Sequence, residues 1–130
     1  MAERIDAHHH LWRYTAAEYG WLDESMRSLR RDFLPRDLMR VVSAAGVDGT
    51  VVVQARQTME ETRWLLQMAD ECEAIRGVVG WAPIAGEDFP GVMEEFEYRP
   101  KLKGLRQKMV RYSFLVHYYT LLTFEVQLIC

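Results

Sequence analysis

The chain has 130 residues, of which 49% are apolar and 27% are charged, and its formal net charge is -3. This composition is typical of one ordinary globular domain and offers no basic surface for nucleic acid. Two cysteines, Cys72 and Cys130, are too few for a disulfide framework, and no secretory signal opens the chain, so the cytoplasm is the expected location.

The first expected element is a β-strand at residues 5–10, which contains three consecutive histidines. Side chains alternate between the faces of a strand, so His8 and His10 share one face with Asp6, and His9 points to the other. Neutral imidazole is a common ligand of zinc and similar ions. The two same-face imidazoles predict part of a metal site, and a solvated polar patch is the alternative.

A long polar and aromatic connection follows at residues 12–33. Loops of this length are uncommon and often functional, although a short helix is expected around residues 23–29. The aromatic side chains either wall a pocket beside the strand end, or Trp21 and Leu22 simply cover the sheet.

A helix is expected to begin at Pro35, which suits a first turn, and to end at Gly46 as its C-terminal cap. Four apolar residues at the i, i+3, i+4, i+7 spacing predict one buried face: Leu38, Val41, Val42 and Ala45.

The β-branched run at residues 50–53 is typical of a strand buried on both faces. With the preceding elements it makes a βαβ unit. Gln54, Ala55 and Arg56 then lie at the carboxyl end of this strand, the edge where parallel α/β proteins bind ligands.

The pattern then repeats. Thr58 and Glu61 have the spacing of a capping box, and Gly77 precedes a third strand at residues 78–82. The helix between them has one apolar stripe, which we assign to the core: Leu65, Met68, Ala69 and Cys72.

A third helix is expected from Asp88, with Pro90 tolerated in its first turn and Pro100 ending it. Residues 102–106 are a candidate fourth strand. Strands that alternate with helices predict a parallel sheet with right-handed crossovers.

The first strand reads Asp6-x-His8-x-His10-x-Trp12, and this motif resembles the first-strand motif of the amidohydrolase superfamily. Within it, the nearest branch is that of the sugar-lactone hydrolases, the fuconolactonase-like and rhamnonolactonase-like enzymes. The resemblance covers residues 4–106. Further stretches match in order and spacing: residues 18–22, 31–35, 46–54, 61–66, 77–81 and 101–106.

The resemblance implies a (β/α)8 barrel, which needs roughly 200–250 residues. We therefore expect residues 1–106 to form the N-terminal half of such a barrel. Gln107 stands where the family usually has a histidine, and residues 107–130 match nothing in it. This apolar tail lacks the uninterrupted run of ~20 apolar residues that a membrane span requires, and it is interpreted as the product of a truncated or frame-shifted gene or an alternative transcript. The structural alternative is a substitute strand or helix on the open sheet.

In complete relatives, the resemblance implies a metal that polarises the carbonyl of a lactone and activates water. The first-strand histidines hold it in part, and later strands add histidines and an aspartate acting as general base. Here His8 and His10 match the ligands, and zinc is favoured by ligand type. Nothing matches the later ligands or the aspartate, so the catalytic residues are unknown. His117 in the tail is not expected to be a ligand.

Three residues are predicted to bind a small sugar lactone or related cyclic ester. Trp12 is placed to pack on a sugar ring, and Gln54 and Arg106 to hydrogen-bond its hydroxyl or carboxylate oxygens. Arg56 is expected to be solvated or ion-paired instead.

Two other functions compete with a lactone hydrolase. One is a catalytically silent fragment that pairs its open sheet edge with itself or with a full-length relative. The other is a small α/β binding domain with a ligand at its strand ends. Half a barrel leaves apolar surface uncovered, so low solubility of the isolated chain is expected.

Overall fold

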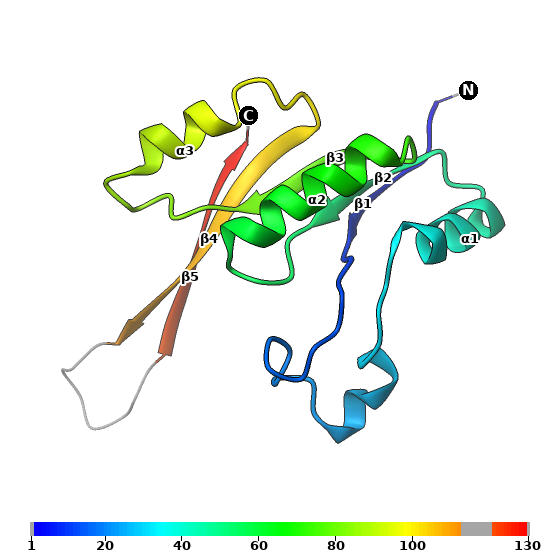
Figure 1. Cartoon of the computed structure of the whole chain (residues 1–130), viewed down its shortest axis with the longest axis horizontal. Helices are drawn as coiled ribbons and strands as arrows, with labels where there is room; N and C mark the ends of the chain where they lie inside the picture. The colour runs from blue at the N-terminus through cyan, green and yellow to red at the C-terminus, as the bar shows by residue number, and fades with distance from the viewer. Residues whose placement is uncertain (1, 113–120, 130) are drawn as a thin grey trace.

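A computed structural model describes residues 2–112 and 121–129, and the side chains up to residue 107. The described residues form one sheet in the order β1-β2-β3-β4-β5, in which β1 to β4 are parallel and β5 is antiparallel to β4 (Figure 1). The strands are β1 (Ile5–His9), β2 (Gly49–Val53), β3 (Ile75–Trp81), β4 (Leu102–Tyr112) and β5 (Leu121–Ile129).

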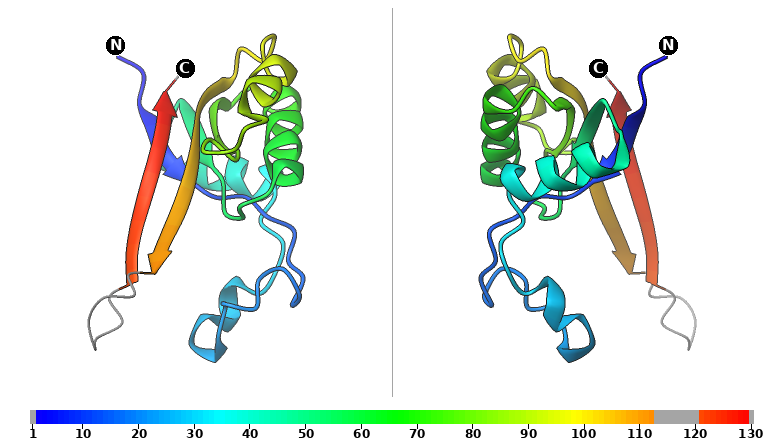
Figure 2. Two further views of the ribbon diagram at one scale, coloured as in Figure 1. Left: turned by 90° about the vertical axis from the view of Figure 1, so that its left-hand side faces the viewer. Right: turned by 90° about the vertical axis from the view of Figure 1, so that its right-hand side faces the viewer.

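The helices alternate with the parallel strands, as predicted. They are α1 (Pro35–Ala45), α2 (Met59–Glu71) and α3 (Phe89–Glu95), and a short 3-10 helix, η1 (Glu24–Leu29), lies in the long connection. Figure 2 shows α2 and α3 on one face of the sheet, while none of the described helices covers the other face of β4. No described helix is long and apolar enough to cross a membrane.

The main core lies between α2 and the central strands. Leu65 and Leu66 of α2 are fully buried with Val52 of β2 and Val78 of β3. Burying each such side chain stabilises the fold by roughly 1.5–3 kcal/mol. The stripe predicted for this helix and the burial predicted for residues 50–53 are therefore confirmed.

Helix α2 crosses β3 closely at Gly80. A Cβ atom on Gly80 would lie 2.4 Å from Cγ2 of Thr62. The Thr62 hydroxyl donates to the Trp81 carbonyl and accepts from the Trp81 N–H, both at 2.8 Å. Glycine is needed because the helix is held this close to the strand.

The capping box predicted at the start of α2 is only half formed. Thr58 Oγ1 accepts from the Glu61 N–H at 3.2 Å, as expected. The Glu61 carboxylate, however, accepts from the N–H groups of Ala55 (3.0 Å) and Arg56 (2.7 Å). The loop after β2 folds back over the start of α2 and brings these two N–H groups to the buried Glu61 carboxylate, which accepts both hydrogen bonds.

Helix α1 begins and ends as predicted, with Gly46 at φ 62° in the left-handed region. Its predicted buried face is wrong in part, because Val42 is buried but Val41 is 66% exposed and Ala45 is exposed. The helix lies beside the edge strand β1, and among the described residues no further helix packs on its outer side.

The chain departs from the expected boundaries at three places. Strand β3 begins at Ile75, before Gly77, and α3 ends at Glu95, well before Pro100. Strand β4 runs on to Tyr112, so the change expected at residue 107 falls inside a strand. The alternative interpretation of the tail as a substitute strand is confirmed by β5. His117 and the rest of 113–120 lie outside the described residues.

Candidate metal and substrate site

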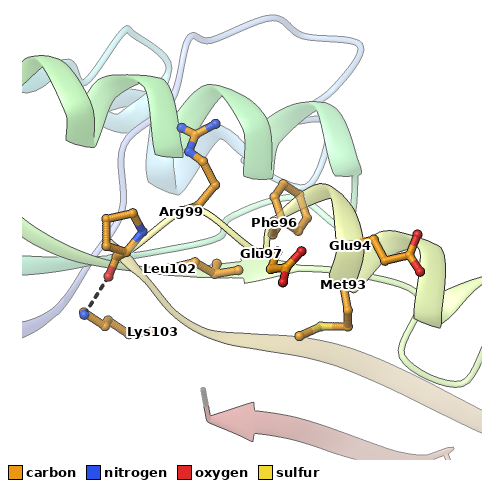
Figure 3. A pocket seen from close by; sticks show the side chains of 8 residues that line it. Met93, Glu94, Phe96, Glu97, Arg99, Leu102 and Lys103 are labelled. Carbon is orange, nitrogen blue, oxygen red and sulfur yellow. Dashed lines mark hydrogen bonds between the residues drawn. The ribbon is translucent and has the colours of Figure 1, made fainter.

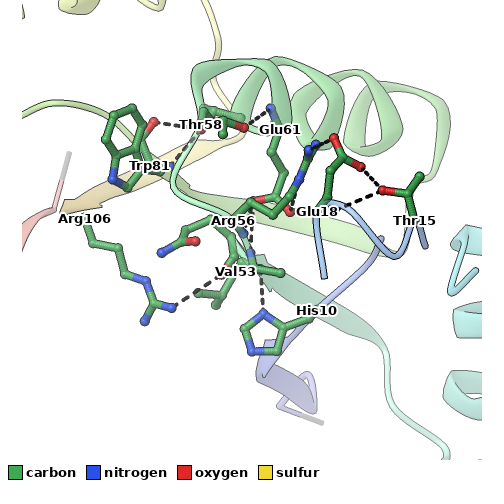
Figure 4. A network of polar contacts seen from close by, with 12 residues as sticks. His10, Thr15, Glu18, Val53, Arg56, Thr58, Glu61, Trp81 and Arg106 are labelled. Atoms are coloured by element: carbon green, nitrogen blue, oxygen red, sulfur yellow. Dashed lines mark hydrogen bonds and ion pairs between the residues drawn. The ribbon is translucent and has the colours of Figure 1, made fainter. Parts of the chain in front are cut away.

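The site lies where the parallel strands end. Parallel strands bring their carboxyl ends to one edge of a sheet, the edge that binds ligands in α/β barrels. His10 follows β1 and Gln54 follows β2, and Arg106 lies within β4, in register with Trp81 at the carboxyl end of β3. Figure 4 shows His10, Val53 and Arg106 at this edge.

The His8 and His10 rings come together as predicted. Their centroids are 5.1 Å apart and the ring planes meet at 76°. The Nδ1 atom of His10 lies 2.9 Å from the carbonyl oxygen of Val53. A carbonyl only accepts hydrogen bonds, so Nδ1 carries the proton and Nε2 keeps its lone pair. Metal-binding histidines typically make this second hydrogen bond, which fixes the ring.

The surroundings keep the His10 ring neutral. Desolvation by neighbouring protein atoms lowers its pKa, and the charges of His8 and Arg106 lower it further. The pKa of His9 is also lowered, mainly by burial. Its Nε2 lies 3.0 Å from Oγ1 of Thr50, so His9 is engaged by β2 and is separate from the pair. Neutral imidazole is the form that binds a metal.

Asp6 was predicted to share the face of the pair on the basis of strict alternation along β1. The register between β1 and β2 shifts between Asp6 and His9: three steps along β1 run beside two steps along β2, from Thr50 to Val52. Strict alternation does not hold across such an irregularity. The Asp6 carboxylate accepts from the His8 N–H at 3.1 Å, and its charge acts on the His9 ring.

The pair fits part of a metal site. Catalytic zinc normally has three protein ligands, and among the described residues no group of three His, Cys, Asp or Glu side chains is arranged to hold an ion. Gln107, at the position where the family usually has a histidine, accepts from the Ala85 N–H at 2.9 Å. The described part of the chain thus supplies two imidazoles of such a ligand set.

Gln54 and Arg106 meet next to His10. Nη2 of Arg106 donates to the Gln54 carbonyl at 3.4 Å, one residue beyond the carbonyl that holds His10. Gln54 is 5% exposed, and its side-chain oxygen is buried with no hydrogen-bond partner. An unsatisfied buried acceptor is costly, and a ligand hydroxyl is one group that would satisfy it.

Trp12 is held in a second cluster, apart from these residues. Its ring packs against Tyr19 and Phe33, at centroid distances of 5.8 and 5.0 Å. Its Nε1–H donates to the Arg31 carbonyl at 2.9 Å. Leu22 is buried in the same cluster, whereas Trp21 is 57% exposed, so the expectation that Trp21 covers the sheet is wrong.

A polar network around the buried Glu61 was missed from the sequence. Arg56 pairs with Glu18 of the long connection, lies 3.9 Å from Glu61, and stands over the Tyr19 ring at 5.9 Å (Figure 4). Burial raises the pKa of Glu61 to about 7. The expectation that Arg56 is ion-paired is confirmed. The spacing of Glu61 indicated a cap, and no sequence signal indicated its long-range partners.

A hollow of about 770 Å³ lies elsewhere, between α3 and the start of β4 (Figure 3). Met93, Phe96 and Leu102 give it an apolar wall, and Lys103 donates to the Pro100 carbonyl at 2.7 Å. It lies at the amino end of β4, opposite the histidines, and is therefore separate from the candidate site.

The fold and the edge residues define a class. Four parallel strands alternating with helices, and polar side chains at their carboxyl ends, are part of a TIM-type barrel. A sequence profile of the amidohydrolase family matches residues 5–122, and the chain belongs to this family.

Individual relatives show the degree of sequence similarity. The chain is 37% identical over 106 residues to L-fucono-1,5-lactonase from Burkholderia ambifaria and 37% identical over 108 residues to that from Burkholderia multivorans. A solved structure of a zinc-bound amidohydrolase from Burkholderia multivorans matches 80% of this chain at 38% identity, with a TM-score of 0.76.

The matched segment is most of this chain but only a part of each relative. The matches cover 82% and 83% of this chain but only 37% and 36% of the two lactonases, and 36% of the solved chain. The chain thus corresponds to about a third of these relatives, and the expectation of a partial barrel is confirmed.

Proposed function

We propose that this chain carries the first-strand part of a metal site that serves to open a sugar lactone. His8 and His10 hold a divalent ion, zinc by ligand type, and Gln54 and Arg106 bind the oxygens of the lactone. Trp12, in the aromatic cluster against which Ala55 packs, supplies an apolar wall for the sugar ring. The observation that supports this most directly is the His10 ring, fixed by Val53 with Nε2 left to bind an ion.

The names of the relatives indicate the substrate class. Two of them act on L-fucono-1,5-lactone, and the related solved structure contains zinc. A bound divalent ion would supply a Lewis acid and a water of lowered pKa. The residues of this chain contribute substrate contacts: the Gln54 side-chain oxygen accepts from a ring hydroxyl, and the Arg106 guanidinium donates to a carbonyl or hydroxyl oxygen.

Zinc binding tests the proposal. We expect the full chain to bind zinc in a calorimetric titration, and His8→Ala or His10→Ala to weaken binding by more than about tenfold, since even outer partners of a ligand are worth 10–100-fold. His9→Ala, at the neighbouring position, is the matched control and should retain binding. Zinc binding unchanged in both ligand variants would refute the proposal.

Turnover is expected to be weak or undetectable with the chain alone, because a third ligand and a general base are lacking among the described residues. This favours, as a second candidate, a silent fragment that associates through its sheet edge. Strand β1 has a neighbour on one side in the described sheet, and its Ile5 is 42% exposed. A stable complex with a full-length L-fucono-1,5-lactonase, with no lactone opened by the fragment itself, would favour this candidate.

A further inference from the structure

The ligand set of the His8 and His10 pair is incomplete. Structural zinc is almost always bound by four ligands in a tetrahedron, and catalytic zinc by three protein ligands and water. The described part of the chain offers two imidazoles and no third group near them. Both histidine side chains are exposed, so a second molecule can reach them.

The pair also lies on an open edge. Strand β1 is the first strand of the sheet order, and β2 is its partner. Its residues Ile5 to His8 are exposed. An exposed edge presents unpaired N–H and carbonyl groups that favour pairing with another strand, and the same edge carries the two ligands.

We propose that a second copy of this chain completes the metal site. The two copies meet antiparallel across a two-fold axis beside His9, at the end of each β1, and one zinc ion is held by four imidazoles, the His8 and His10 rings of each copy. The inference rests on the part of the proposed function that makes these two residues ligands. It adds the partner, the number of ligands and the stoichiometry of one ion per two chains.

The geometry of an antiparallel pair allows this arrangement. A two-fold contact is self-complementary, so residue i of one copy meets residue j of the other and the reverse. With the axis beside His9, His8 of one copy lies opposite His10 of the second copy. Opposite residues on one face have Cβ atoms about 4.5–5.5 Å apart. All four rings then gather on one face, within reach of one ion at roughly 2.0–2.1 Å from each nitrogen.

Neighbouring groups are compatible with this contact. The His10 ring is already oriented by Val53, and the His9 side chain is turned to Thr50 of its own chain. His9 therefore leaves the metal face clear.

The test is zinc titration of the chelator-treated full chain, followed by sedimentation velocity and native mass spectrometry. We expect the mass to double when zinc is added, with one zinc per two chains, and to return to that of the monomer on chelation. His8→Ala and His10→Ala should each abolish the zinc-dependent doubling, while His9→Ala should keep it. Circular dichroism of each variant establishes that the fold is retained.

Other outcomes separate the two proposals. If each monomer binds one zinc ion with no change in mass, the proposal that a second copy completes the site is overturned. The proposal that His8 and His10 are ligands is then unaffected. Doubling that does not depend on zinc would also overturn it. No zinc bound at any ratio would overturn this inference together with the metal part of the proposed function.

Discussion

At the scale of single residues, Glu61 is a buried carboxyl whose ionisation opposes folding. Its pKa is raised to about 7 from an ordinary 4.5, chiefly by burial. Between these values the folded chain binds more protons than the unfolded chain, so the free energy of unfolding falls as pH rises. A shift of this size corresponds to about 3 kcal/mol, present in full below pH 4.5 and lost above pH 7.

Glu61→Gln should remove this dependence. The amide keeps an oxygen for the N–H groups of Ala55 and Arg56 and has no charge to bury. Thermal unfolding of both chains from pH 5 to 8 measures the effect. The lowered pKa values of His9 and His10 act in the opposite direction but are common to both chains, so the difference between the curves reports Glu61. Parallel curves would contradict the assignment.

At the scale of elements, the close packing of α2 on β3 can be tested by a substitution at Gly80. Gly80→Ala places a methyl group 2.4 Å from Thr62, whose hydroxyl is held by two hydrogen bonds to Trp81. Neither the new methyl group nor the Thr62 side chain can move away easily. We expect a loss of about 1–3 kcal/mol in the free energy of unfolding, measured in urea.

A matched control lies in α3. A Cβ atom on Gly91 would meet nothing within 4 Å, and alanine is the better helix former. Gly91→Ala should therefore stabilise the chain slightly, by roughly 0.5–1 kcal/mol. Equal effects of the two substitutions would mean that packing against Thr62 does not matter.

The sequence predicts the order of the elements well, because apolar periodicity and the caps of helices are local signals. The stripe on α2 and the cap at Gly46 are examples. It predicts poorly what depends on neighbours distant in the chain. Examples are the exposure of Val41, the register shift between Asp6 and His9, and the hydrogen bonds of Glu61 to the loop after β2.

The candidate site likewise has one part that the sequence predicts and one part that it does not. The pairing of His8 and His10 could be predicted, since two residues of one strand are related by alternation alone. The hydrogen bond from His10 to Val53 and that from Arg106 to Gln54 could not, because each joins residues of different strands whose register the sequence does not state.

At the scale of the whole molecule, the chain exposes apolar surface that a full barrel would cover. Val41 on α1 is 66% exposed. Val41→Lys should leave the melting temperature nearly unchanged, since lysine is a good helix former and lies four residues from Asp37. It should raise the concentration at which the metal-free chain stays monomeric, measured by light scattering. Aggregation at an unchanged concentration would show that this patch is not responsible.

The antiparallel strand β5 has a further consequence for any attempt to rebuild a complete enzyme. It pairs with β4 from Gly104 to Tyr112 and so occupies the position that a fifth parallel strand would take. Appending the remaining units of a lactonase after Ile129 would leave them on the wrong side of a hairpin. A working chimera must instead be joined near Arg106, so that the new segment replaces β5.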